Sequence, residues 1–231
     1  MMAQSKMNNA QRKDGQLVPY TLIQRAGGGG RAICFICPGS SYSFDRPLLY
    51  YSTMLMLEQG LDVVHVHYSY GSDNTDYWML PPRKRGALML QDVEAVVRHV
   101  LADQPRKEIL FIGKSIGTLP IVSGFGESML PSEASAILLT PLLNQEGFAE
   151  SLLACKQNMY LVTGTADHYY HSETIEQIRD KHANIELDIV PNADHSLEIP
   201  FDTTVSLETL QQVFSGISRF TSDTLRSDNS R

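Results

Sequence analysis

A serine between two glycines is the feature of this 231-residue sequence that most clearly suggests chemistry. Residues 113–117 read Gly-Lys-Ser-Ile-Gly, which places Ser115 in a G-x-S-x-G pattern. The apolar run EILFI comes directly before the pattern, and a stretch of helical character comes directly after it. A nucleophile raised above a sheet needs a tight strand-to-helix turn, and the residues two positions to either side must then be small. The pattern therefore predicts that Ser115 is an exposed nucleophile at such a turn.

A histidine and a carboxylate are needed beside this serine, because a hydroxyl is a weak nucleophile until an oriented base takes its proton. His195 follows the last apolar run in the loop VPNADHSLEIP, and Asp167 follows the run NMYLVT in the loop TGTADHYY. Like Ser115, both come just after a strand, at the carboxyl edge where open α/β sheets collect their functional groups. Asp194 and Glu146 are alternative acids, the first beside His195 and the second after the preceding strand.

The elements that would position these residues alternate along the chain. Short runs rich in Ile, Val and Leu predict strands, and longer amphipathic stretches predict helices. We expect strands at 17–24, 32–37, 61–68, 108–113, 136–143, 158–163 and 185–190, and helices at 47–59, 83–103, 116–129, 145–156, 172–182 and 203–219. Such alternation is typical of an α/β fold with a mostly parallel central sheet, here of about seven strands with helices on both faces.

One domain accounts for most of the chain. We see no repeat, low-complexity linker or shift in composition inside residues 17–219, which we expect to form a single domain. Residues 1–16 are polar and are predicted to be a flexible segment, and residues 220–231 are predicted to be a polar tail.

The sequence resembles the α/β-hydrolase superfamily over residues 17–219. The resemblance lies in the elbow GKSIG, in the segments LVTGTADHYY and PNADHSLE, and in the order serine, acid, histidine. It implies that Ser115 is the nucleophile, His195 the general base and acid, and Asp167 the acid that orients His195. Only residues 144–157 separate AILLTPLL from NMYLVT, so we expect a lidless serine hydrolase with no cap domain.

The resemblance also implies an oxyanion hole made of two backbone N–H groups. One belongs to the residue after the nucleophile, here Ile116. The other lies in the loop after an early strand, where relatives carry His-Gly and this sequence carries Pro38-Gly39, so we assign Ser40 as the second donor.

Three further residues are candidates for substrate binding. Ser41 lies beside the predicted oxyanion hole, and Tyr70 and Trp78 lie in the polar loop after residues 61–68. Together with Tyr77 and Met79 of the same loop, these two aromatic residues are candidates for a wall against the acyl or alcohol group. The alternative is that this loop is simply packed on the surface.

Composition excludes several classes of partner. The formal net charge of −7 argues against nucleic acid. No apolar run approaches the ~20 residues that span a bilayer, and the polar start lacks the apolar stretch of a secretory signal. Three irregularly spaced cysteines favour a reducing cytoplasm over a disulfide framework. The glycines at 27–30 lie between two predicted strands and indicate a turn rather than a phosphate site.

Three motifs that are typical of other chemistry have simpler interpretations here. Cys34 and Cys37 form a CxxC inside a strand, where residues three apart point to opposite faces, so we expect packing rather than redox chemistry. His65 and His67 share a strand face but lack the further ligands that a metal requires. Lys114 has no evident catalytic task and is expected to face solvent or a sheet edge.

The sequence thus predicts a carboxylesterase-like serine hydrolase that cleaves an ester of a small-molecule acyl substrate through an acyl-enzyme. It requires no cofactor and no metal, and the oligomeric state stays open. A thioesterase, peptidase or acyltransferase would use the same residues. A non-catalytic binding module on this scaffold is the alternative of a different class.

Overall fold

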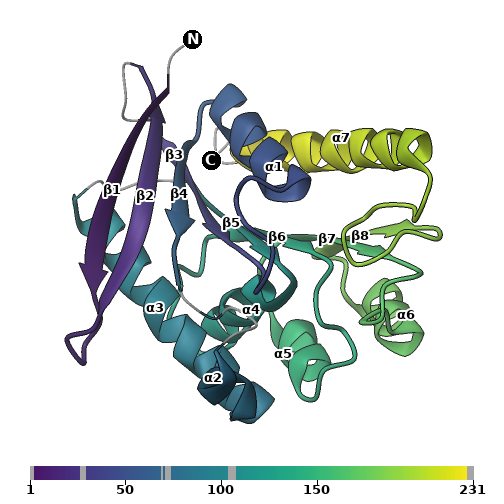
Figure 1. Cartoon of the computed structure of the whole chain (residues 1–231), viewed down its shortest axis with the longest axis horizontal. Helices are drawn as coiled ribbons and strands as arrows, with labels where there is room; N and C mark the ends of the chain where they lie inside the picture. The colour runs from purple at the N-terminus through teal and green to yellow at the C-terminus, as the bar shows by residue number, and fades with distance from the viewer. Residues whose placement is uncertain (1–2, 27–29, 69, 71–73, 104–107, 228–231) are drawn as a thin grey trace.

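The computed structural model describes residues 3–26, 30–68, 70, 74–103 and 108–227, and its described strands form one twisted sheet (Figure 1). Eight strands appear in this part of the chain: β1 Ala3–Gln11, β2 Leu17–Arg25, β3 Ala32–Cys37, β4 Asp62–Val66, β5 Glu108–Lys114, β6 Ser135–Leu139, β7 Met159–Gly164 and β8 Ile185–Val190. Their order across the sheet is β1-β2-β4-β3-β5-β6-β7-β8. Six strands from β4 to β8 pair in parallel, while β1 and β2 are antiparallel additions at one edge.

Helices cover both faces of the sheet (Figure 1). The described helices are α1 Pro47–Glu58, α2 Thr75–Met79, α3 Pro82–Asp103, α4 Thr118–Gly126, α5 Phe148–Ala154, α6 Ser172–Lys181 and α7 Thr203–Ser227. Buried side chains of α1 and α7 share one apolar cluster with one face of the sheet, and those of α3, α4, α5 and α6 share another with the opposite face. The predicted fold class, an α/β sheet covered on both sides, is confirmed.

Strand β3 shows why the central strands read as continuous apolar runs. Ile33, Phe35 and Cys37 enter the cluster with α3 and α4, whereas Cys34 and Ile36 enter the cluster with α1 and α7. Both faces are therefore dry, and successive side chains alternate between them. The two cysteines lie on opposite faces as predicted, and both are free and buried. Burial raises the pKa of each thiol, which keeps it protonated.

The two ends of the chain differ from the prediction. Residues 3–11, expected to be flexible, form β1, which pairs along its whole length with β2. Residues 220–227, expected to be a polar tail, continue α7, whose Phe220 is buried. A short helix, α2, also occurs inside the segment predicted to be a loop. Of the glycines expected to form a turn at 27–30, residues 27–29 lie outside the described residues.

The parallel strands share a carboxyl edge, and this edge carries the candidate site. The register places Lys114, the last residue of β5, beside Leu139 of β6, and Gly164 of β7 beside Val190 of β8. The loops after β5, β7 and β8 therefore leave the sheet at the same edge. None of the helices in the described ranges combines the length and apolar character that crossing a bilayer requires.

Candidate active site

Ser115 occupies the tight turn that its flanking glycines predict. It follows β5 directly, has a backbone φ of +56°, and begins the short 3-10 turn Ser115–Gly117 that leads into α4. A Cβ at Gly117 would lie 2.2 Å from the carbonyl oxygen of Cys37, and one at Gly113 would lie 2.7 Å from the carbonyl oxygen of Gly117. Side chains have no room at either position, which is the steric reason for the G-x-S-x-G spacing.

The three residues predicted to act together meet in one chain of hydrogen bonds. Nε2 of His195 lies 2.8 Å from Oγ of Ser115, and Nδ1 of His195 lies 2.8 Å from Oδ2 of Asp167. The other carboxylate oxygen, Oδ1, accepts the backbone N–H of Tyr169 at 2.9 Å. The Asp167 side chain is fully buried and that of His195 is 25% exposed. The residue Ser115 as a whole is 8% exposed, so it is more buried than the prediction of an exposed nucleophile implies.

The loops after β7 and β8 are locked together, which fixes the spacing of Asp167 and His195. The N–H of Ala166 donates to the carbonyl of Ala193 at 3.0 Å, and the N–H of Thr165 donates to the carbonyl of Val190 at 3.0 Å. A Cβ at Gly164 would lie 2.1 Å from the Ala193 oxygen, so only glycine permits this approach. The acid and the base therefore belong to one joined pair of loops.

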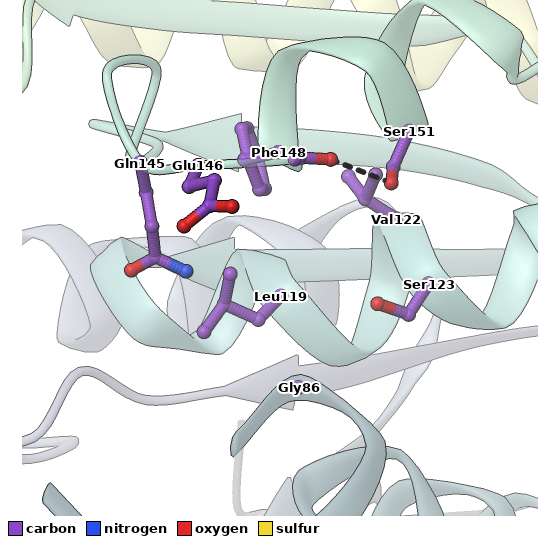
Figure 2. Close-up of a pocket in the computed structure, with 9 residues that line it drawn as sticks. Gly86, Leu119, Val122, Ser123, Gln145, Glu146, Phe148 and Ser151 are labelled. Carbon is purple, nitrogen blue, oxygen red and sulfur yellow. Dashed lines mark hydrogen bonds between the residues drawn. The ribbon is translucent and has the colours of Figure 1, made fainter. Parts of the chain in front are cut away.

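Neither alternative acid takes the place of Asp167. Oδ1 of Asp194 accepts the backbone N–H groups of Ser196 at 2.7 Å and Glu198 at 3.2 Å, so this carboxylate shapes the loop that carries His195. Glu146 lines a small pocket between α3, α4 and the start of α5. Figure 2 shows it above Leu119 of α4, beside Phe148. The carboxylate that bonds His195 is that of Asp167.

The turn that carries Ser40 lies directly against the serine. A Cβ at Gly39 would be 3.5 Å from the Cβ of Ser115, and a bridge between Gly39 and Tyr42 closes the turn. Ser40 is half-buried, and its N–H donates to no backbone or side-chain acceptor among the described residues. Ile116 is buried within the 3-10 turn. Both residues of the predicted oxyanion hole are thus close to Ser115 in the fold.

The residues predicted to bind substrate have different environments. Ser41 is exposed in the same turn as Ser40. Tyr70 is buried in the core, and its hydroxyl donates to Oδ2 of Asp92 at 2.6 Å, so the structure packs this ring into the fold instead of presenting it to a ligand. Trp78 is half-buried on α2, with the Arg85 guanidinium 5.0 Å from its ring centroid. Its contact with substrate stays a prediction.

His65 and His67, the pair that shares a strand face, have structural partners. Nε2 of His65 lies 2.7 Å from Oγ1 of Thr53, and Nε2 of His67 lies 2.7 Å from Oγ1 of Thr21. Phe44 stacks on the His65 ring with centroids 3.8 Å apart. Burial, reinforced by the neighbouring His67, lowers the pKa of His65 to about 4. These hydrogen bonds and stacked rings are those of core histidines.

One group of three potential metal ligands lies at the site itself. Ligand atoms of Asp167, His168 and His195 lie within 4.8 Å of one another. His168 is largely exposed, with Nδ1 3.7 Å from Oδ1 of Asp167. Asp167 and His195 already bond each other, and His195 also bonds Ser115. Two of the three candidate ligands, Asp167 and His195, are therefore engaged in the serine-centred chain.

The position of Lys114 differs from the one that the sequence predicts. It was expected to face solvent or a sheet edge, but it is 1% exposed. Burial lowers the pKa of its amine to about 7, although the carboxylates of Asp167 and Asp194 oppose that shift. Strand alternation was the available signal, because Leu110 and Ile112 share its parity and both face the cluster with α1 and α7.

The family model for an alpha/beta hydrolase domain matches residues 32–222, so the chain belongs to this family. No curated protein matches the sequence.

Solved structures with the same fold cover nearly the whole chain. A lidless α/β serine hydrolase from Xanthomonas campestris is 15% identical, with a TM-score of 0.68, and the alignment covers 94% of this chain and 95% of that one. An esterase from Pyrococcus furiosus is 16% identical, with a TM-score of 0.71 and coverage of 95% and 92%. A dienelactone hydrolase from Anabaena variabilis is 17% identical, with a TM-score of 0.70 and coverage of 95% and 97%. These likenesses confirm the α/β-hydrolase fold without a cap domain.

Proposed function

We propose that this protein is a serine hydrolase that cleaves a carboxylic ester, or a related acyl bond, of a small molecule through an acyl-enzyme. The observation that carries the proposal is the unbroken chain from Ser115 through His195 to the buried carboxylate of Asp167, with both links at 2.8 Å. The solved esterases and hydrolases of the same fold support this class of reaction.

In the first half of the reaction, Oγ of Ser115 attacks the carbonyl carbon of the substrate while Nε2 of His195 accepts the hydroxyl proton. Asp167 accepts the N–H at Nδ1 of His195, which leaves the lone pair of Nε2 facing the serine. The same carboxylate stabilises the imidazolium that forms. His195 then gives its proton to the leaving alkoxide as the ester C–O bond breaks, and the acyl group remains on Ser115.

In the second half, a water molecule repeats the attack on the acyl-enzyme. His195 takes the proton of the water, the tetrahedral intermediate collapses, and the proton passes to the departing Oγ of Ser115. The N–H groups of Ile116 and Ser40 hold the negative oxygen in both halves. One such donor contributes about 10²–10³-fold to kcat in serine hydrolases.

Covalent labelling tests the proposal. A fluorophosphonate probe should modify the wild-type protein once, with the added mass on the peptide that contains Ser115, and p-nitrophenyl esters should be hydrolysed. Ser115→Ala should lose the label and at least about 10⁴-fold of the esterase rate. Ser132→Ala, at an exposed serine between α4 and β6, is the matched control and should keep both.

The same measurements separate the alternatives. A panel of p-nitrophenyl esters, thioesters and anilides, each with and without an added alcohol acceptor, distinguishes an esterase from a thioesterase, a peptidase and an acyltransferase. No label and no turnover with any of them would point to a binding module and end the proposal.

We also propose that the protein works in a reducing compartment such as the cytoplasm. The three cysteines support this location, since all are free and buried and none lies in a disulfide.

A further inference from the structure

A buried lysine lies directly under the candidate active site. Lys114 is the residue before Ser115, and its side chain leaves β5 on the face that packs against α1 and α7. Charged groups are seldom buried without partners, since desolvation disfavours the charged form. Yet the described residues give Nζ of Lys114 no hydrogen bond and no carboxylate within 4 Å. This lysine therefore needs an explanation other than an ion pair.

The group that Nζ of Lys114 does meet is an aromatic ring. Nζ lies 5.1 Å from the ring centroid of Tyr42, within the range of a cation–π interaction. Tyr42 closes the turn that begins at Gly39, and its hydroxyl accepts the backbone N–H of Leu48 at 3.1 Å. The ring thus links β5, the turn and the first residues of α1.

This turn is also the one that touches the nucleophile. A Cβ at Gly39 would lie 3.5 Å from the carbonyl oxygen of Lys114 and the same distance from the Cβ of Ser115. A movement of Tyr42 would therefore shift the N–H of Ser40 relative to Ser115. Oxyanion donors act only when held at hydrogen-bond distance from the developing charge.

The charged groups around Lys114 come from three loops. The carboxylate of Asp167, after β7, and that of Asp194, after β8, both favour the ammonium form. Burial raises the pKa of the Tyr42 hydroxyl. The charge of Glu198 also raises this pKa, and that of Arg46 lowers it. The ammonium is thus opposed by burial and favoured by two carboxylates, one of which belongs to the serine-centred chain.

We propose that Lys114 is a positioning residue whose ammonium holds the Tyr42 ring and, through it, the turn that carries the Ser40 N–H against Ser115. The inference rests on the proposed function, because the turn matters for catalysis only if an oxyanion forms there. The positioning itself is a property of the folded chain and is measurable without any substrate.

Hydrogen exchange tests the positioning directly. In Lys114→Met, which keeps the length of the side chain and removes the charge, the amides of residues 39–44 should exchange at least about fivefold faster than in wild type, because the turn opens more often. Tyr42→Leu removes the ring and should give the same increase, whereas Tyr42→Phe keeps the ring. Unchanged exchange in both Lys114→Met and Tyr42→Leu would overturn the proposal even if the protein hydrolysed no ester.

Kinetics test the consequence for catalysis. With p-nitrophenyl acetate at pH 6.5, Lys114→Met should lower kcat about tenfold to hundredfold with little change in KM, since a donor to the oxyanion is displaced. Wild-type kcat should fall above pH 7 as the ammonium loses its proton. Lys114→Arg stays charged and should keep its kcat at pH 9, because a guanidinium also binds an aromatic face.

The matched control is Lys156→Met, which removes an exposed lysine between α5 and β7 and should follow the wild-type pH profile. Circular dichroism confirms that each variant is folded before its rate is compared. A Lys114→Met profile that superimposes on wild type from pH 6 to 9 would also overturn the proposal. A wild-type protein that reacts with neither ester nor fluorophosphonate would instead refute the proposed function, and hydrogen exchange would still decide the role of Lys114.

Discussion

Two buried clusters at the carboxyl edge of the sheet contain similar groups but arrange them differently. The hairpin cluster consists of Arg12, Asp92 and Tyr70, and the active-site cluster consists of Lys114, Asp167 and His195 together with Ser115. Each has a buried aspartate and a buried cation. In the hairpin cluster every charge has a charged partner at hydrogen-bond distance. In the active-site cluster the aspartate bonds a histidine, and the group that faces the lysine ammonium among the described residues is an aromatic ring.

The hairpin cluster joins three distant segments. Nη1 of Arg12, just after β1, donates to Oδ1 of Asp92 on α3 at 3.0 Å, and Nη2 donates to Asp14 at 2.6 Å and to Gln91. The hydroxyl of Tyr70 occupies the other oxygen of Asp92. Burial opposes the charge of Arg12, but the hydrogen bonds and the charges of Asp92 and Asp14 outweigh it and raise the pKa of Arg12.

The comparison shows that buried charged groups have different roles in the two clusters. A cation and an acid that satisfy each other resist change in protonation, which suits a joint between segments. In the active-site cluster, Asp167 bonds the imidazole of His195 and the backbone N–H of Tyr169, neither of which is a fixed cation. Among the described residues, Lys114 has no carboxylate at hydrogen-bond distance, so its protonation and that of His195 can change. Variants that change one aspartate at a time should therefore differ in whether they lose activity or stability.

The largest effect is expected from Asp167→Asn. The amide would favour the wrong tautomer of His195 and would not stabilise the imidazolium, so kcat should fall about 10⁴-fold. Thermal unfolding should change little, because the shape of the side chain is kept. Steady-state kinetics with p-nitrophenyl acetate and a melting curve check the pair of expectations. A variant that melts far below wild type would show that Asp167 has the structural role that we assign to Asp92.

Asp92→Asn should show the opposite pattern. It leaves the guanidinium of Arg12 buried without its main partner, and breaking a buried pair costs about 3–5 kcal/mol of stability. Urea unfolding should report this loss while the fluorophosphonate label per folded molecule stays near wild type.

Two further variants sharpen the result for Asp92. Glu186→Gln, which breaks the exposed pair with Arg219 at 2.8 Å, should cost under about 1 kcal/mol. The double variant Arg12→Met with Asp92→Leu should be more stable than Asp92→Asn alone, since neither charge is then left unpaired.

The free energy of unfolding should also depend on pH through Lys114 of the active-site cluster. The pKa of Lys114 is lowered to about 7 in the folded chain, whereas in the unfolded chain a lysine keeps its proton to about pH 10. Between these values the unfolded state binds more protons, so stability should rise with pH, by about 3 kcal/mol over the whole window. Lys114→Met should lack this rise in urea titrations at pH 7, 8.5 and 10. Parallel titrations for the variant and wild type would mean that Lys114 does not change its charge.

A smaller effect than that of Asp92→Asn is expected from Tyr70→Phe. It removes one hydrogen bond to a charged acceptor, which contributes about 1.5–3 kcal/mol, and the lower end applies because Arg12 still holds Asp92. Ester hydrolysis should be nearly unchanged if Tyr70 is a core residue. A large rise in KM without loss of stability would return Tyr70 to the substrate-binding role that its sequence position suggested.

Much of the site could be predicted from sequence because its constraints are local. The small residues that the tight turn requires lie within five consecutive positions, 113–117. Asp167 and His195 each follow a strand that is recognisable as an apolar run. The bounds of β3 and β8 match the prediction to the residue. Both strands are short runs that contain Ile, and a proline follows each of them.

The missed features depend on contacts between distant residues. Strand β1 reads AQSKMNNAQ, and Ala10 is its only buried residue, so no hydrophobic pattern marks it. Backbone pairing with β2 makes it a strand. The bond between Arg12 and Asp92 spans 80 positions, and no spacing rule connects them. The prediction for Lys114 relied on its charge, which favours solvent. Its alternation with Leu110 and Ile112 along the strand indicates the buried face instead.

The polar character of β1 has a practical consequence. As the outermost strand, β1 covers the hydrogen-bonding edge of β2, whose sequence LVPYTLIQR is considerably more apolar. A version of the protein trimmed before residue 12 would offer that edge to other molecules as a template for intermolecular strand pairing and aggregation. Expression trials that shorten the chain should therefore keep these nine residues, even though three strands separate β1 from β5, the strand that leads to the serine.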